Sequence, residues 1–306
     1  MKYLVAGGSG LVGSAIVREL ENRKLDVSGI SRKNVDLLNR SATFEYLKKN
    51  KPDVVIDAAA KVGGIGGNNA FPVEFLTENI QIQSNLMDAA HAAGVNKFVF
   101  LGSSCIYPRF AEQPIKEEFI LTGPLEATNS AYAVAKIAGI ELIKSYRKEY
   151  GHKWISVMPT NLYGPNDNFD LETSHVLPAL IRKFVDARVN GADTVTLWGT
   201  GEPLREFLHV DDLSKAIILC LEKYDDDLHV NIGSGSEISI RNLAQKIAKH
   251  AKFTGEIVWD KSKPDGTPRK ILDINRISEL GWKPIISLDD GIKNTVEWYQ
   301  QRRLGV

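Results

Sequence analysis

Cysteine is scarce in this sequence: Cys105 and Cys220 are its two cysteines among 306 residues. Two cysteines exclude a framework of several disulfide bridges and favour a reducing compartment, so we expect a cytoplasmic protein. No apolar run approaches the roughly 18–20 residues that a membrane-spanning helix needs. The chain begins directly with a strand-like apolar run at residues 2–6, and we therefore expect no signal peptide ahead of it.

An excess of charge of either sign is also missing. The sequence has 38 Lys and Arg residues and 38 Asp and Glu residues, so its formal net charge is zero. A neutral total gives no support for nucleic acid or a membrane as a partner. We see no repeats, no low-complexity tract and no residue pattern that predicts a metal site. With 43% apolar and 25% charged residues, the chain has an ordinary globular composition and is long enough for two unequal domains.

Three glycines, spaced three residues apart, follow the first apolar run and precede a helix expected over residues 14–22. Glycines in a strand–turn–helix context let the backbone approach a pyrophosphate, and the helix N-terminus then faces the phosphates. We therefore predict a dinucleotide site here rather than a tight turn without a ligand. Its expected contacts are Gly7, Gly10, Leu11, Val12 and Gly13.

The second expected strand, residues 26–30, ends in a basic turn that contains Arg32. A site that prefers NAD usually has Asp or Glu there to hold the ribose 2′-hydroxyl. A cation suits the 2′-phosphate of NADP(H) instead, which makes NADP(H) the expected cofactor. The alternative is a solvated basic turn. Asp36 and Leu37, a few residues further on, are expected to line the adenine pocket.

Two hydroxyls and a thiol follow the apolar strand expected at residues 97–101. Ligands collect at the carboxyl ends of strands in an open α/β sheet. Ser103 and Cys105 are therefore candidate reactive groups, with Leu101 and Gly102 beside them as cofactor contacts. Taken alone, the stretch is equally well explained as a Ser-rich turn with a small buried cysteine.

Tyr132 and Lys136 are four residues apart on a helix expected downstream, and so share one helix face. An ammonium beside a phenol favours the phenolate, so we expect Lys136 to lower the pKa of Tyr132 from its ordinary value of about 10. Such a tyrosine exchanges a proton near neutral pH. A Tyr and a Lys at this spacing are often only a surface pair, but here they follow a glycine turn and a strand that ends in two serines.

Strands and helices alternate through the first half of the chain. The alternation predicts an α/β fold with a Rossmann-type, doubly wound parallel sheet and right-handed crossovers. Further strands are expected at residues 53–57 and 154–158, with a helix at 72–93 between them. A flexible, glycine-dense loop at 61–69 either covers a substrate or is only a long connection.

A smaller, discontinuous α/β lobe is expected from about residue 165, where polar loops interrupt the alternation. We assign residues 1–164 and 207–232 to the dinucleotide-binding domain, and residues 165–206 and 233–306 mainly to a substrate-binding lobe. The remaining expected elements are helices at 176–188, 213–221, 239–250 and 287–303, strands at 194–198 and 230–233, and an irregular charged turn at 263–270.

The glycine turn, Ser103 and the Tyr132/Lys136 pair together resemble the extended short-chain dehydrogenase/reductase family. The segments that carry the likeness are residues 58–65, 101–108, 156–165, 174–176, 205–212 and 263–270. The resemblance implies that Ser103, Tyr132 and Lys136 form a reductase triad, and that Cys105 and His175 are an acid/base pair for epimerisation. It implies further cofactor contacts at Ala58, Lys136, Pro159, Asn161, Leu162 and His175. It also implies contacts with a nucleotide sugar at Asn161, Lys183, Trp198, Arg205, Asp265 and Arg269.

Within the family, the chain is similar to members that convert GDP-4-keto-6-deoxy-D-mannose to GDP-L-fucose. The implied reaction inverts C3 and C5 and then reduces the 4-keto group with NADPH. Related enzymes that act on a GDP-linked 3,6-dideoxyhexose or a heptose are the alternatives, and so is a nucleotide sensor without catalysis. A dehydratase is disfavoured because Cys105 and the preceding serine stand where a dehydratase needs an acidic pair.

One residue departs from the family pattern. Ser9 stands in the glycine turn where the family often has a basic residue, so Arg32 must carry more of the preference for NADP(H). The resemblance also suggests a homodimer, formed through the helices near residues 72–93 and 130–150.

Overall fold

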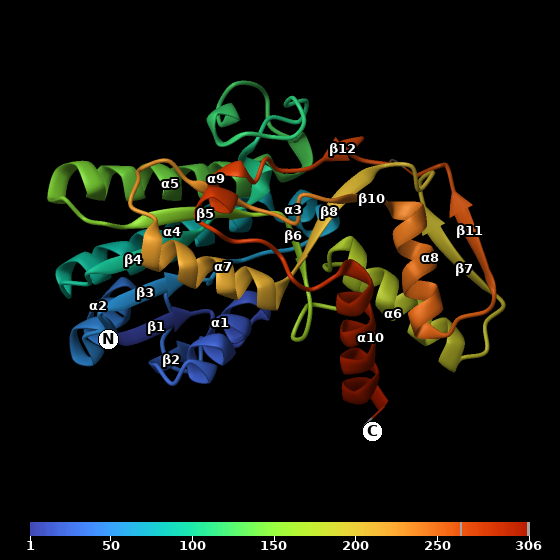
Figure 1. The fold of residues 1–306 in the computed structure, drawn as a ribbon, viewed down its shortest axis with the longest axis horizontal. Coiled ribbons are helices and arrows are strands. Elements are labelled where there is room, and N and C mark those ends of the chain that lie inside the picture. Colours follow the sequence, from blue (N-terminus) through green and yellow to red (C-terminus); the bar gives the residue numbers. More distant parts are fainter. Residues whose placement is uncertain (264, 305–306) are drawn as a thin grey trace.

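The computed structural model describes residues 1–263 and 265–304, which form a larger and a smaller lobe (Figure 1). The larger lobe is built on a parallel sheet of six strands in the order β2-β1-β3-β4-β5-β9. The strand order changes direction between β1 and β3, which is where open α/β sheets bind ligands. The strands are β1 Lys2–Ala6, β2 Asp26–Ile30, β3 Val54–Asp57, β4 Lys97–Leu101, β5 Ile155–Pro159 and β9 Val230–Ile232.

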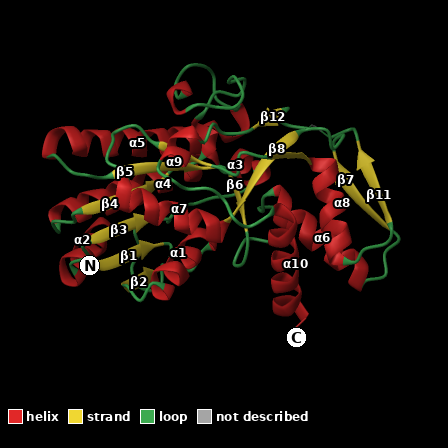
Figure 2. Ribbon diagram, viewed as in Figure 1, coloured by secondary structure: helices red, strands yellow, loops and turns green. Residues whose placement is uncertain are grey.

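Helices cover both faces of this sheet (Figure 2). Helices α1 (Leu11–Asn22) and α7 (Val210–Lys223) pack on one face, and α2 (Arg40–Asn50), α4 (Pro72–Ala92) and α5 (Ser130–Tyr150) pack on the other. Strands β3 and β5 are buried along their whole length because side chains on both faces meet a helix layer. The predicted α/β fold with a doubly wound parallel sheet is therefore confirmed.

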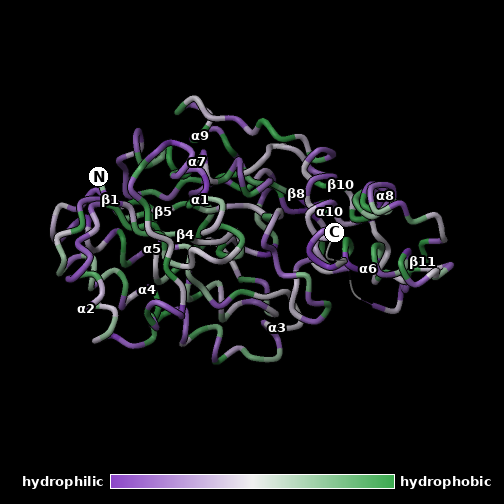
Figure 3. Tube along the Cα trace, turned by 90° about the horizontal axis from the view of Figure 1, so that it is seen from below, coloured by the Kyte–Doolittle hydropathy of each residue, from purple (hydrophilic) through white to green (hydrophobic). Residues whose placement is uncertain are grey.

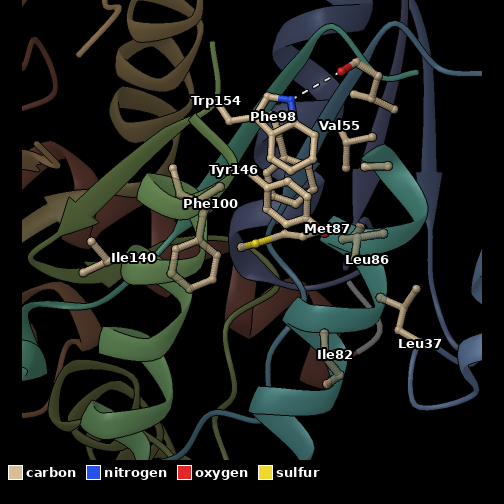
Figure 4. Packing of buried hydrophobic residues seen from close by; sticks show 14 of the residues in the cluster. Leu37, Val55, Ile82, Leu86, Met87, Phe98, Phe100, Ile140, Tyr146 and Trp154 are labelled. Atoms are coloured by element: carbon tan, nitrogen blue, oxygen red, sulfur yellow. Dashed lines mark hydrogen bonds between the residues drawn. The ribbon is translucent and has the colours of Figure 1, made fainter. Parts of the chain in front are cut away.

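Aromatic side chains fill the space between the sheet and α4 and α5 (Figure 4). The rings of Phe98 and Tyr146 lie 5.0 and 4.8 Å from the ring of Trp154, measured between centroids. The indole N–H of Trp154 donates to the Val95 carbonyl at 3.3 Å, the bond dashed in Figure 4. Full burial of a side chain such as Phe98 stabilises the fold by roughly 1.5–3 kcal/mol.

The smaller lobe lies at the other end of the long axis in Figure 1. Three helices, α6 (Val176–Val189), α8 (Ile240–Ala251) and α10 (Leu288–Leu304), pack around their own apolar cluster. Two short sheets complete the lobe and its junction with the larger one. Their strands are β6 Asn161–Tyr163, β7 Thr194–Trp198, β8 Leu204–His209, β10 Glu237–Ser239, β11 Glu256–Asp260 and β12 Arg269–Lys270.

Several expectations about individual segments need correction. The glycine-dense stretch at 61–69 is not entirely loop, because α3 (Ile65–Ala70) forms within it. The charged turn at 263–270 contains the short strand β12, while Pro264 lies outside the described residues. Residues 233–306 are expected mainly in the smaller lobe, but two of them pack in the core of the six-stranded sheet: Ile277, which lies in α9 (Asn275–Glu279), and Trp282, which follows this helix.

The hydropathy of the chain follows this arrangement. Figure 3 shows apolar colours along the central strands of the larger lobe, and polar colours collect on turns and outer helix faces. None of the described helices is long and apolar enough to cross a membrane.

Candidate active site

A cavity of about 690 Å³ lies at the carboxyl ends of β1, β3, β4 and β5, where the sheet faces residues 160–175. This is the edge at which the strand pattern placed the site. All five predicted catalytic residues line it: Ser103, Cys105, Tyr132, Lys136 and His175. The predicted cofactor contacts that also line it are Gly7, Gly10, Leu11, Val12, Arg32, Asp36, Leu37, Ala58, Leu101, Gly102, Pro159, Asn161 and Leu162.

The glycine turn forms one end of the cavity. A Cβ atom on Gly7, which has a φ of +75°, would lie 2.6 Å from the carbonyl oxygen of Ala58. Gly13 does not line the cavity, because it packs the first turn of α1 against Gly7; a Cβ there would lie 2.1 Å from the Gly7 oxygen. Gly10 begins α1 without a side-chain cap, so the first amides of the helix are free for an anion. This backbone fits the pyrophosphate of a dinucleotide.

Arg32 borders the same end of the cavity, beyond β2. Its side chain is 75% exposed and its guanidinium lies 3.6 Å from the Glu78 carboxylate, a long and solvated ion pair. The side chain can therefore turn toward an anionic group without breaking a strong contact. Asp36 and Leu37 line the same cavity.

Ser103 connects the end of β4 to the thiol. It caps a single 3₁₀ turn, Ser104–Ile106, by accepting a hydrogen bond from the Cys105 amide at 3.3 Å. Its hydroxyl also donates to the Cys105 sulfur at 3.1 Å. Gly102 lets this segment lie close to β5, because a Cβ there would lie 2.2 Å from the Met158 sulfur. One hydroxyl and one thiol are therefore held side by side on the cavity wall.

Tyr132 and Lys136 reach the cavity from α5. The Lys136 ammonium is buried and donates to the Leu101 carbonyl at 2.8 Å, and it lies 5.9 Å from the centre of the Tyr132 ring. Burial raises the pKa of Tyr132 well above its ordinary value, nearby Cys105 adds to the rise, and Ser103 opposes it. The prediction that Lys136 lowers this pKa is therefore wrong for the structure, because the ammonium is directed at a backbone carbonyl and burial dominates.

His175 stands at the N-cap of α6 and lines the same cavity as Ser103, Tyr132 and Lys136. The residues just before His175 are held in place by Gly64, the N-cap of α3. The Gly64 amide donates to the Thr173 carbonyl at 2.8 Å, and a Cβ on Gly64 would lie 2.5 Å from the Ser174 oxygen. His175 keeps an exposed surface inside the cavity. Protein atoms packed around the ring, and then the charge of Lys270, hold the pKa of His175 below its ordinary value.

Lys270 is a site residue that the sequence reasoning missed. It lies on β12, lines the cavity, and forms no ion pair with a carboxylate of the described residues. Burial lowers its pKa, while Cys105 acts in the opposite direction. Lys270 is paired in register with Arg205 on β8, so two cations lie next to one another. The sequence feature that could have identified Lys270 is its position at the end of the charged stretch at 263–270.

The predicted sugar-binding residues divide into two groups. Asn161 lines the cavity and its side-chain amide donates to the Glu206 carbonyl at 2.8 Å. The others do not line it and lie on the smaller lobe: Lys183 on α6, Trp198 at the end of β7, Arg205 on β8, Asp265 between β11 and β12, and Arg269 on β12.

Hydrogen bonds and ion pairs already occupy two of the charged groups in this outer set. The Asp265 carboxylate accepts bonds from the amide and hydroxyl of Thr200 at 2.7 and 2.8 Å. Arg269 pairs with Glu237 at 2.7 Å. Arg205 is better placed than Arg269 to bind an anionic ligand, because Lys270 lies beside it and it forms no ion pair with a carboxylate in the described part of the chain. Its guanidinium donates at 2.8 Å to the Leu204 carbonyl.

Comparisons with known proteins agree with this site. The sequence model of the NAD dependent epimerase/dehydratase family matches residues 3–233. GDP-L-fucose synthase 1 of Arabidopsis thaliana is 52% identical over 299 residues, which are 97% of this chain and 93% of that protein. The crystal structure of a GDP-L-fucose synthetase from Naegleria fowleri bound to NADP superposes with a TM-score of 0.91 at 31% identity, covering 99% of this chain and 94% of the other. A GDP-6-OMe-4-keto-L-xylo-heptose reductase from C. jejuni superposes with a TM-score of 0.92 at 33% identity, covering 98% of each chain.

Proposed function

This chain belongs to the NAD dependent epimerase/dehydratase family, and from that premise we propose that it converts GDP-4-keto-6-deoxy-D-mannose to GDP-L-fucose. The reaction inverts C3 and C5 and then reduces the 4-keto group with NADPH. One observation carries the proposal: the Ser103 hydroxyl lies 3.1 Å from the Cys105 sulfur and also contacts Tyr132. A single sugar oxygen held by Ser103 is then within reach of both the epimerising thiol and the reducing acid.

Inversion needs a base on one face of the sugar and an acid on the other. The 4-keto group acidifies the protons on both neighbouring carbons. The Cys105 thiolate removes one of these protons, the electron pair moves onto the 4-oxygen to form an enolate, and the His175 imidazolium returns a proton to the opposite face. Cys105 is then a thiol and His175 a neutral ring, so a proton passes from one to the other through solvent before the second inversion.

Substrate binding helps to set these protonation states. Burial and the charge of Lys270 hold the pKa of His175 low, which disfavours the imidazolium at rest. Arg205 and Lys270, which are neighbours across β8 and β12, are the cations suited to the doubly charged diphosphate of a GDP-sugar. The diphosphate would screen Lys270, and protonation of His175 then becomes easier.

Reduction uses the same carbonyl. When bound, NADPH supplies the hydride that adds to C4. Tyr132 is protonated at rest because burial raises its pKa, and it donates that proton to the 4-oxygen. Ser103 holds this oxygen as it holds the enolate oxygen in the first stage. Lys136, which lies near the Tyr132 ring, would hold the cofactor ribose, and Arg32 would bind the 2′-phosphate that distinguishes NADPH from NADH.

A reductase that leaves C3 and C5 untouched is the second candidate, because the C. jejuni heptose reductase has the same fold at 33% identity. Cys105 and His175, which both line this cavity, favour an enzyme that also epimerises. Incubation of the purified protein with NADPH and GDP-4-keto-6-deoxy-D-mannose, followed by product analysis by NMR, separates the two. GDP-L-fucose is the expected product, and an uninverted GDP-6-deoxyhexose would contradict the proposal.

We also propose a cytoplasmic location, from the need for a free Cys105 thiol, and a homodimer, from the exposed apolar side chains of α4 and α5. Cys105 has to be a free thiol, as both cysteines are here, which suits the cytoplasm. Helices α4 and α5 pack together and leave Val73, Ile80 and Val134 exposed, and we assign this surface to a homodimer. Light scattering on a sizing column should give a dimer, and Val134→Glu should give a monomer.

A further inference from the structure

Asp57 is a buried acid directly beneath the active site. It is the last residue of β3 and is 1% exposed. One carboxylate oxygen accepts a bond from the Ala59 amide at 3.1 Å. The other, Oδ2, is fully buried and has no hydrogen-bond partner in the part of the chain that the structure describes. An unpartnered buried carboxylate oxygen destabilises a fold unless a nearby charge compensates it.

The register of the sheet places this acid beside the Lys136 ammonium. Asp57 is paired with Phe100 on the neighbouring strand β4. Val55, two residues earlier on β3, packs in the cluster between the sheet and α5, and so does Phe100. Strand alternation puts Asp57 on that same face. Lys136 reaches down from α5 to this point, with its Nζ 4.8 Å from the centre of the Phe100 ring.

We propose that Asp57 is a positioning residue for the reduction step, one whose carboxylate keeps Lys136 charged and seated beside Tyr132. The catalytic consequence of this inference rests on the proposed function, but the electrostatic coupling between the two groups does not. Asp57 does not line the cavity, so it acts only through Lys136. The unpartnered Asp57 oxygen destabilises the fold, and this role explains why it is retained: its negative charge stabilises the neighbouring Lys136 ammonium.

The charges of the pair support this role. Burial raises the pKa of Asp57 to about 6, and Lys136 opposes the rise. Burial lowers the pKa of Lys136 to about 8, and Asp57 and then Cys105 oppose the fall. The ionisable groups that face this ammonium are thus Asp57 from β3, Cys105 from the 3₁₀ turn and Tyr132 from α5 itself. Both groups are charged between these two pKa values; below the lower one Asp57 is neutral, and above the upper one Lys136 is neutral.

Asp57→Asn removes the carboxylate charge with little change of shape. Without that charge the pKa of Lys136 falls, so the alkaline limb of the reduction profile should move to lower pH. If the pKa of Lys136 falls from about 8 by one pH unit, its protonated fraction at pH 8 falls about fivefold, so we expect single-turnover NADPH oxidation to fall about fivefold near pH 8. The rate should stay within about twofold of the parent below the pKa of Asp57. Deuterium exchange at C3 and C5 should be unchanged.

Asp53→Asn is the matched control, because it makes the same charge change just before the same strand, where the carboxylate accepts a bond from the Lys2 amide at 2.7 Å. Its profile should follow the parent. If Asp57→Asn does not fold, Asp57→Leu replaces it, since leucine leaves no buried polar group. A variant profile that superimposes on the parent, or an equal loss of reduction and exchange at every pH, would overturn the proposal.

A second readout needs no substrate. Reductive ¹³C-methylation of the lysines, with the Lys136 signal assigned from its absence in Lys136→Arg, follows the titration of this ammonium by NMR. The pKa of Lys136 should be lower in Asp57→Asn than in the parent and unchanged in Asp53→Asn. If the proposed function fails while this difference is present, the Asp57–Lys136 coupling stands; if the difference is absent, the coupling itself is wrong.

Discussion

Acidification should destabilise the fold through one buried histidine, His229. The residue is 0% exposed, and its Nε2 lies 2.8 Å from the Tyr107 hydroxyl. That hydroxyl donates its proton to the side-chain oxygen of Asn231 at 2.5 Å, since the Asn231 amide nitrogen is committed to the Ile115 carbonyl at 3.0 Å. Nε2 of His229 must therefore be the donor to Tyr107, and Nδ1 is left buried with no hydrogen-bond partner among the described residues. A second proton on the ring would go to this unpartnered nitrogen.

The magnitude follows from the pKa. Burial, aided by the charges of Lys144 and Arg276, lowers the pKa of His229 from 6.5 to about 3. Because the folded pKa is lower than the unfolded one, the unfolded chain binds the extra proton, and stability present above pH 6.5 is lost as the pH falls toward 3. The loss is about 1.4 kcal/mol per pH unit, about 2 kcal/mol by pH 5 and about 5 kcal/mol over the whole window.

Urea unfolding measured at several pH values between 7 and 5 tests this reasoning. His229→Gln keeps an N–H that can donate to Tyr107 but cannot titrate, so its free energy of unfolding should fall by about 2 kcal/mol less than the parent's over that range. Tyr107→Phe is the control, since it should lower stability by about 1–3 kcal/mol at every pH while it retains the slope. Equal slopes for His229→Gln and the parent would refute the assignment.

Two further predictions concern ligand binding. Arg32→Ala should raise KM for NADPH by roughly 10–100-fold and leave KM for NADH unchanged, because a charge-assisted bond to the 2′-phosphate is lost; equal KM values for the two cofactors in the parent enzyme would show that Arg32 does not select. Lys270→Met should raise KM for the GDP-sugar by roughly 10–100-fold without changing KM for NADPH. An unchanged sugar KM in steady-state kinetics would remove Lys270 from the diphosphate site.

The sheet and one edge of the site were predictable because they depend on local pattern. The run at 97–101 is apolar after Lys97, which is typical of strands buried on both faces. Strand ends then bring Gly7, Ala58 and Ser103 to one edge whatever the details of the loops. The starts of α1 and α7 were harder to predict. Glycines surround the first turn of α1, and a strand-like apolar run leads directly into α7.

What could not be predicted depends on contacts between distant segments. Helix α3 forms in a glycine-dense stretch because Gly64 docks on Thr173, more than a hundred positions away. The helical spacing of Tyr132 and Lys136 gave their common face but not the direction of the ammonium, which the Leu101 carbonyl fixes. Burial decides the pKa of Tyr132, and burial is not visible in a four-residue spacing.

The most direct test of the central claim is deuterium incorporation at C3 and C5 of GDP-4-keto-6-deoxy-D-mannose in heavy water, compared between the parent and Cys105→Ser. Cys220→Ala is the control, because Cys220 is buried in the core of the larger lobe. Cys105→Ser should lower exchange at least about 100-fold while it still oxidises NADPH, and Cys220→Ala should exchange normally. Undiminished exchange in Cys105→Ser would contradict the assignment of Cys105 as the epimerising base.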